Sequence, residues 1–272
     1  MTNSQKPLIL LTNDDGIDSP GLAASAAALD PLGDLLIVAP AKQQSAMGRS
    51  LPIFMKGQME KTIISYGDKS WEGYAAQASP AQCSQFGIIE LADRPVILTV
   101  SGINFGENVG TGVTISGTVG AALESASLGV PGIAVSLEVD MSLHVDFDNS
   151  VDFSSAMYFT RLFASRWLAT DTPSDVDVLK IDVPIKATHE SEWMVTRLEK
   201  KRYYTPTPKV GRKLHEEGRM GYKVSPKLET SSNDTDVAAL RDGKVSVTPI
   251  SLDMTSRVGL DTIHALLNSS KS

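Results

Sequence analysis

The segment Leu8-Ile9-Leu10-Leu11-Thr12-Asn13-Asp14-Asp15-Gly16 decides the fold class of this chain. Its first four residues are apolar without alternation, which is typical of a strand buried on both faces of a parallel sheet. A polar loop follows as far as Pro20, and apolar residues then recur at helical spacing over 21–29. The order of strand, polar loop and helix is that of an α/β protein.

Three further apolar runs, at 35–38, 96–100 and 132–136, indicate more buried strands of the same kind. Polar segments follow the first two, over 39–50 and over the glycine-rich stretch 101–117. Repeated units of this type predict a parallel sheet with helices on both faces. Ligands bind beyond the carboxyl ends of strands in such sheets, so we expect the three polar loops to converge on one site.

The second half of the chain has a different pattern. A helix is expected over 153–168, and residues 244–248 alternate like a strand, whereas 187–234 is mixed and polar. We expect residues 1–186 to form a catalytic domain with the metal and phosphate site. Residues 187–272 are expected to form a smaller β-rich extension for oligomerisation, whose C-terminal segment returns to the core or is exchanged between subunits.

The composition of the chain disfavours several classes of function. A formal charge of −7 disfavours a protein that grips polynucleotides, but allows a small phosphorylated substrate if a bound cation supplies positive charge. No stretch approaches the ~20 apolar residues of a membrane helix, and the N-terminus does not resemble a signal peptide. The single Cys83 excludes an internal disulfide and a cysteine-rich metal site. We therefore expect a cytoplasmic protein without a membrane partner.

The first candidate for chemistry is the pair Asp14 and Asp15. Two carboxylates at the end of a buried strand repel each other, and a hard divalent cation resolves that conflict. The alternative is an ordinary turn or helix cap, since Asn-Asp-Asp-Gly is common in turns.

The loop 39–50 is the second candidate. Ser45 offers a neutral oxygen ligand, and Gly48 allows a close backbone approach to an anion. Lys42 and Arg49 are candidates for phosphate binding. The alternative is an ordinary surface loop with solvated charges.

The third candidate is the glycine-rich segment, where Asn104 offers an amide oxygen just past a strand. Ser116, Gly117 and Thr118 begin the next helix, whose free N–H groups attract anions. Ser116 can also be a simple N-cap. Together the loops suit one divalent cation and a phosphate, and a metal-bound water would attack phosphorus. We therefore expect a metal-dependent phosphomonoesterase.

The three loops resemble the signature loops of the SurE family (survival protein E, the stationary-phase survival nucleotidases). The matching segments are Asn13-Asp14-Asp15-Gly16, Ala39-Pro40 with Ser45, Ser101-Gly102-Ile103-Asn104 and Ser116-Gly117-Thr118-Val119-Gly120-Ala121-Ala122, in the order and spacing of the family. The resemblance implies a Rossmann-like fold with a mixed sheet edge. It also implies a 5′/3′-nucleotidase that acts on nucleoside monophosphates, and on other phosphomonoesters or short polyphosphate.

The resemblance further implies one divalent cation per subunit, Mn, Mg or similar, and a homodimer or homotetramer. The implied metal ligands are Asp14, Asp15, Ser45 and Asn104. In the mechanism that we expect, Asn13, Gly48 and residues 116–118 bind the phosphate oxygens, and Asn13 acts in catalysis with Asp14 and Asp15.

Several positions depart from the pattern of the family. They are Ala78, Gln82, Gly112, Ile115 and Asp182. None is a proposed ligand, so these departures bear on base and sugar preference more than on the chemistry.

Other functions remain open at this stage. In a haloacid-dehalogenase-like phosphatase the nucleophilic aspartate would fall on Asn13, which cannot form an aspartyl phosphate. A nicotinamide dehydrogenase lacks its glycine motif after the first strand. The remaining alternative is a non-catalytic nucleotide-binding or regulatory protein that keeps the pocket, which turnover of a phosphomonoester would distinguish.

Overall fold

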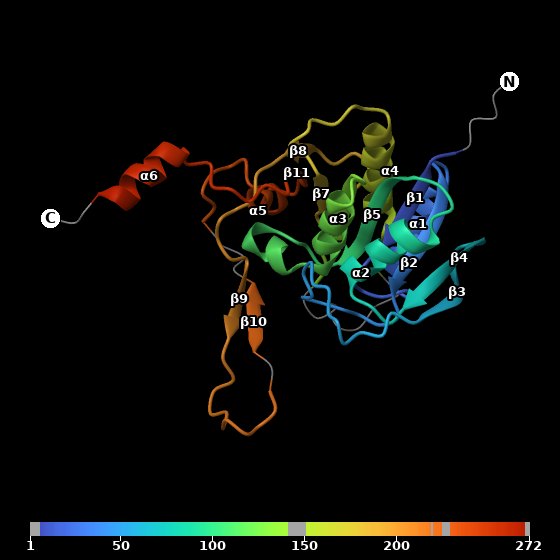
Figure 1. Cartoon of the computed structure of the whole chain (residues 1–272), viewed down its shortest axis with the longest axis horizontal. Helices are drawn as coiled ribbons and strands as arrows, with labels where there is room; N and C mark the ends of the chain where they lie inside the picture. The colour runs from blue at the N-terminus through green and yellow to red at the C-terminus, as the bar shows by residue number, and fades with distance from the viewer. Residues whose placement is uncertain (1–5, 141–150, 219, 225–228, 270–272) are drawn as a thin grey trace.

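Figure 1 shows the computed structural model of the chain, which describes residues 6–140, 151–218, 220–224 and 229–269. A nine-stranded sheet forms the centre of the molecule. Its strands, in spatial order, are β3 (Met59–Tyr66), β4 (Lys69–Ala76), β2 (Asp34–Pro40), β1 (Leu8–Thr12), β5 (Val96–Phe105), β6 (Gly132–Leu137), β7 (Val178–Val183), β11 (Val245–Ile250) and β8 (Trp193–Val195).

The middle of this sheet is parallel and its edges are mixed. Strands β4, β2, β1, β5, β6 and β7 pair in parallel, whereas β3 runs antiparallel to β4 and β11 antiparallel to β7. The Rossmann-like prediction of a parallel sheet with a mixed edge is therefore confirmed.

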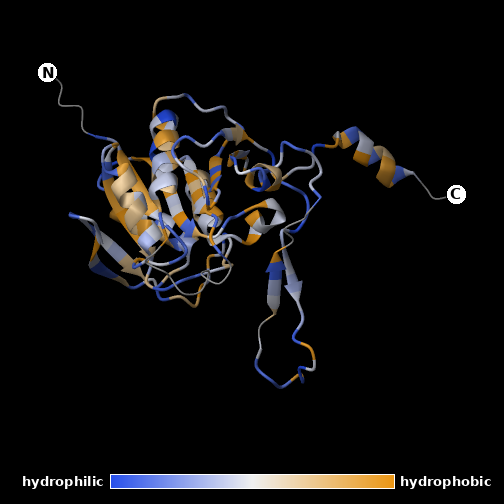
Figure 2. Ribbon diagram, turned by 180° about the vertical axis from the view of Figure 1, so that it is seen from behind, coloured by the Kyte–Doolittle hydropathy of each residue, from blue (hydrophilic) through white to orange (hydrophobic). Residues whose placement is uncertain are grey.

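Helices cover both faces of the sheet. They are α1 (Pro20–Leu29), α2 (Pro80–Gln85), α3 (Gly117–Ser127) and α4 (Ser154–Leu168), joined by a π-helix, η1 (Phe86–Leu91), and a 3₁₀-helix, η2 (Gly110–Ile115). Ile9 and Leu11 pack in one core cluster with α1 and α4, whereas Leu8 and Leu10 pack in another with α2 and η1. This division explains why the first strand is apolar at every position, and Figure 2 shows the apolar interior of the sheet.

The described part of the chain beyond residue 186 contributes strands to the main sheet and also forms a separate antiparallel pair of strands and two helices. β8 and β11 join the main sheet, and a separate antiparallel pair, β9 (Tyr204–Thr207) and β10 (Gly221–Val224), projects from it in Figure 1. The short helix α5 (Asp236–Arg241) is buried, whereas α6 (Leu260–Asn268) has no buried residue. The small C-terminal β-structure is confirmed, and the domain boundary at 186 stays a prediction. Over the described residues, no helix is long and apolar enough to cross a membrane.

A buried ion cluster attaches α5 to the sheet. Lys180 in β7 contacts Asp182 in the same strand, and its Nζ lies 3.2 Å from Oδ2 of Asp236, the first residue of α5. All three side chains are fully buried. Burial alone lowers the pKa of Lys180, but the two carboxylates raise it above its ordinary value, so the lysine is charged.

We predict that Lys180→Met lowers the free energy of unfolding by about 3–5 kcal/mol, because two buried carboxylates lose their counter-charge. Lys244→Met is the matched control, since the Lys244–Glu192 ion pair is exposed and should contribute little. Urea unfolding measures both variants. Equal small losses in the two variants would show that the cluster does not anchor α5.

Candidate metal and phosphate site

The predicted site residues lie on loops at the carboxyl ends of β2, β1 and β5. These strands are neighbours, and the chain order changes direction at β1, with β2 on one side and β5 on the other. This is the topological switch point, where open α/β sheets bind their ligands. The predicted convergence of the three loops is confirmed.

Asp14 and Asp15 follow β1 and are 5% and 4% exposed. Burial raises the pKa of Asp14 to about 6, although hydrogen bonds oppose this effect. Burial and then the charge of Asp14 raise the pKa of Asp15 to about 8. The pair therefore lies in an environment that disfavours two negative charges, and a cation would relieve that conflict.

The start of α3 holds the carboxylate of Asp14. The hydroxyl of Thr118 donates to Oδ1 of Asp14 over 2.6 Å, and the backbone of Gly117 and Thr118 lowers the pKa of this carboxyl. Gly117 allows this approach, because a Cβ there would lie 2.7 Å from Cβ of Asp14. One group that we expected to face a phosphate, the hydroxyl of Thr118, thus donates to an anion of the protein itself.

Asp15 receives donors from the loop after β2 and from the end of β5. The N–H of Phe105 donates to Oδ2 of Asp15 over 3.0 Å, and Nε2 of Gln43 to Oδ1 over 3.3 Å. We did not single out Gln43 from the sequence, because an amide in a polar loop gives no signal of its partner.

Asn104 is buried at the end of β5, and a hydrogen bond from its amide nitrogen sets the orientation of its side chain. Nδ2 donates to the carbonyl oxygen of Gly106 over 2.6 Å, which leaves Oδ1 as the atom that can ligate a cation. The pairing of β5 with β6 shifts register between Ser101 and Asn104. Gly102 has φ 128° at this shift, and a Cβ there would lie 2.3 Å from the carbonyl oxygen of Val135.

Asn13 shapes the turn that presents the two aspartates. Its Nδ2 donates to the carbonyl oxygen of Gly16 over 2.9 Å, and its Oδ1 accepts from the N–H of Gly16 over 3.1 Å. The turn alternative is therefore right for Asn13. A direct contact between Asn13 and phosphate stays a prediction.

The loop after β2 packs closely on the start of α3. The N–H of Gly48 donates to the carbonyl oxygen of Ile115 over 3.0 Å, and a Cβ on Gly120 would lie 2.3 Å from the oxygen of Gly48. The backbone of Gly48 thus lies against the backbone at the start of α3. A contact between Gly48 and phosphate stays a prediction. Ser45 is exposed in this loop, and its role as a ligand also stays a prediction.

Two other predicted residues have defined structural roles. Nε of Arg49 donates to the buried Glu124 over 2.6 Å, so its charge is used within the protein. Ser116 is the N-cap of α3, and its Oγ accepts from the N–H of Val119 over 3.2 Å. The N-cap alternative for Ser116 is therefore confirmed.

A second line of hydrogen bonds links the buried ion cluster to the site. The N–H of Asn108 donates to Oδ1 of Asp182 over 2.8 Å, and its Nδ2 donates to Oγ of Ser136 and to Oγ1 of Thr118. Thr118 in turn donates to Asp14. Asn108 is thus a positioning residue that we did not identify from the sequence, although it lies in the glycine-rich segment.

Glu107, which follows Asn104 closely in the sequence, carries a further buried carboxyl group. Burial raises the pKa of Glu107 to about 7, and the hydroxyl of Tyr204 donates to its Oε1 over 2.6 Å. Tyr204 belongs to β9, so this bond joins the C-terminal hairpin to the loop after β5. Sequence patterns cannot show this contact, because 97 positions separate the two residues.

Of the departures from the family pattern, Asp182 is linked to Asp14 through Asn108 and Thr118, whereas the other four have no described hydrogen bond to the aspartates. Ala78 lines a pocket beside β2, and Nε2 of Gln82 donates to the carbonyl oxygen of Pro52 over 3.2 Å. A Cβ on Gly112 would have open space, and Ile115 is exposed. An effect of these positions on specificity stays a prediction.

The fold and the site together define an α/β protein with a pair of buried carboxylates at the switch point of its sheet. The family described as "Survival protein SurE" matches residues 9–205. The chain therefore belongs to the SurE family, which confirms the resemblance of its loops.

Relatives and a solved structure support this assignment over almost the whole chain. The chain is 39% identical over 261 residues to the 5′-nucleotidase SurE of Thermococcus gammatolerans, with 95% of each protein covered. It is 41% identical over 270 residues to that of Methanothrix thermoacetophila, covering 95% of this chain and 98% of the relative. The crystal structure of the SurE protein from Aquifex aeolicus matches with a TM-score of 0.72 and 29% identity, covering 96% of this chain and 100% of that one.

We predict that Gly117→Ala destabilises the fold by about 1–3 kcal/mol, because the added methyl group overlaps the side chain of Asp14. Gly112→Ala is the matched control, since the space around Gly112 is open. Urea unfolding compares the two variants. Equal stabilities would mean that Asp14 moves away from α3 at no cost.

Proposed function

We propose that this protein is a divalent-metal-dependent 5′-nucleotidase that hydrolyses nucleoside monophosphates to nucleoside and phosphate. The observation that carries the proposal is the pair of buried, adjacent carboxylates at the switch point of the sheet, Asp14 and Asp15. The names of the relatives, 5′-nucleotidase SurE, support the choice of substrate. The same site would accept other phosphomonoesters or short polyphosphate.

The residues of the site fit a hard divalent cation such as Mn²⁺ or Mg²⁺. Asp14 and Asp15 supply carboxylate oxygens without a cationic side chain bonded to either, as far as the described contacts show. Within the described residues, no group of three or more His, Cys, Asp or Glu side chains could hold a metal, so further ligands must be neutral. Oδ1 of Asn104 and the hydroxyl of Ser45 would supply them.

A cation held there would polarise the phosphoryl group and would lower the pKa of the attacking water. Attack by the water would form a new P–O bond and break the ester P–O bond, and the proton that the water loses would pass through solvent to the leaving ribose oxygen. Asp14 and Asp15 keep their places during this reaction because hydrogen bonds from α3, from the loop after β2 and from the end of β5 hold them. Residues 116–118 and Gly48 would contact the phosphate oxygens at the rim of this site.

The assembly is an expectation from the resemblance to the family, and the location is an expectation from the sequence. A homodimer or homotetramer and a cytoplasmic location stay predictions, as does the exchange of C-terminal segments between subunits.

We predict that the purified protein releases phosphate from AMP, GMP and 3′-AMP with Mn²⁺ or Mg²⁺ and not with EDTA. Asp14→Asn should lower kcat/KM by about 100-fold or more, because loss of even an outer partner of a metal site costs 10–100-fold. Lys244→Met is the control and should keep full activity, since Lys244 lies in an exposed ion pair. Absence of release from every substrate with Mn²⁺ would favour a nucleotide-binding protein without turnover.

Metal binding should also change the pH dependence of stability. The pKa of Asp15 is raised from 3.8 to about 8 in the folded protein, so the folded state binds more protons than the unfolded state between these values. The stability of the metal-free protein therefore falls as pH rises through this range. Ionised carboxylates bind the cation, so Mn²⁺ should raise the melting temperature more at about pH 8 than at about pH 5.5.

Thermal melting with EDTA and with Mn²⁺ measures this effect. Asp15→Asn is the matched variant, because an amide can still accept from Phe105 but does not titrate. The variant should lose most of the dependence on both pH and metal. A wild-type melting temperature that responds to neither would contradict a metal site at this pair.

A further inference from the structure

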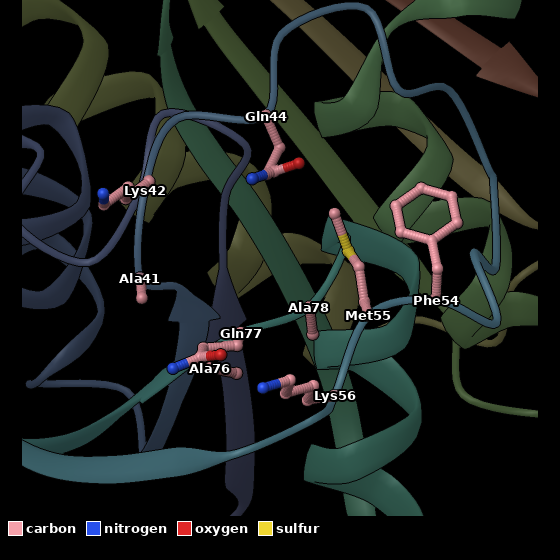
Figure 3. Close-up of a pocket in the computed structure, with 9 residues that line it drawn as sticks. All are labelled: Ala41, Lys42, Gln44, Phe54, Met55, Lys56, Ala76, Gln77 and Ala78. Carbon is pink, nitrogen blue, oxygen red and sulfur yellow. The ribbon is translucent and has the colours of Figure 1, made fainter.

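A cavity of about 490 Å³ lies beside the loop that follows β2 (Figure 3). Its walls come from this loop, from the segment that precedes β3, and from the residues at the end of β4. Figure 3 shows Phe54 and Met55 on one side of the cavity and Lys42 on the other. The volume is within the ~300–1,000 Å³ that is usual for small-molecule sites.

The cavity and the two aspartates share the loop that follows β2. The N–H of Gln44 donates to the backbone oxygen of Asp14 over 2.7 Å, and Nε2 of Gln43 donates to Asp15. Lys42 and Gln44, the neighbours of Gln43, both line the cavity. The loop that contacts both aspartates therefore also forms one wall of the cavity, which places the cavity next to the proposed phosphate site.

Hydrogen bonds hold the outer wall of the cavity in place. The N–H of Gly57 donates to the oxygen of Gln77 over 3.1 Å, and the N–H of Gln77 to the oxygen of Gln58 over 2.8 Å. Gln82 also binds the oxygen of Pro52. The segment that carries Phe54 is thus tied to the chain after β4, and the cavity is formed before any ligand binds.

The lining has the chemistry of a site for an aromatic, phosphorylated molecule. The side chain of Phe54 is 78% exposed although it faces a cavity, so a planar partner would bury a large apolar surface there. Lys42 and Lys56 line the same cavity, and none of its described lining residues is acidic, in a chain of net charge −7. Gln44 and Gln77 add amides that can both donate and accept.

We propose that this cavity binds the nucleoside part of the substrate, with the base stacked on Phe54 and the amides of Gln44 and Gln77 at its polar edges. The proposal rests on the proposed function and adds to it the position of the base. It implies that the enzyme prefers nucleoside monophosphates over phosphate esters that lack a base.

The test compares kcat/KM for AMP with kcat/KM for ribose 5-phosphate, with Mn²⁺, in the full chain. Phe54→Ala should lower the ratio of the two values about tenfold, since loss of one base–aromatic stack has an effect of at least this order. Phe54→Trp should keep the ratio. Ile53→Ala is the matched control, because Ile53 is 99% exposed and does not line the cavity, and its ratio should stay within about twofold.

The outcomes separate this proposal from the proposed function. If the wild type hydrolyses both esters and Phe54→Ala keeps the ratio, the base lies elsewhere and the nucleotidase assignment stands. If the wild type hydrolyses neither ester, the nucleotidase assignment fails. In that case, calorimetry with adenosine tests the cavity. Binding that is lost in Phe54→Ala and kept in Ile53→Ala supports the proposed nucleoside site. Absence of binding by the wild type overturns the proposed nucleoside site.

Discussion

The adjacent carboxylates of Asp14 and Asp15, buried at the end of the first strand, are the constraint on which the rest of this structure depends. Hydrogen-bond donors around a buried pair of like charges stabilise it, and the proposed cation would relieve the remaining repulsion. The donors come from α3, from the loop after β2 and from the end of β5, so three segments that are far apart in the chain are held together at one point. The parallel sheet makes this possible, because it brings the carboxyl ends of β2, β1 and β5 to the same edge.

Close backbone approach is the second requirement of the site. Gly117 lets α3 reach Asp14, Gly102 lets β5 shift its register before Asn104, and Gly120 gives room to the loop after β2. These glycines lie in the segments that resemble the signature loops of the family. In this chain a Cβ at each of them would collide with neighbouring atoms. These close contacts arrange the residues that we propose as metal ligands.

The centre of the site and its surroundings are coupled through buried polar groups. Lys180 joins Asp182 to Asp236, and Asn108 joins Asp182 to Thr118, which holds Asp14. The C-terminal part of the chain therefore contributes to the geometry of a site that lies on the N-terminal half. The cavity beside Phe54 lies on the opposite flank, so the proposed nucleoside site and this support are separated by the aspartates.

The sequence by itself determined the α/β class, the convergence of the loops and the pair Asp14 and Asp15. These follow from local patterns: a strand without alternation is buried on both faces, and the ends of parallel strands meet at one edge. Only the tertiary structure decided the partner of each polar group. Asn13 forms hydrogen bonds within its own turn, Thr118 at the start of α3 donates to Asp14, and Lys180 in β7 forms an ion pair with Asp236 in α5. The reason is physical: a hydrogen bond or ion pair depends on distances of about 3 Å between segments far apart in the chain, and periodicity carries no information about such distances.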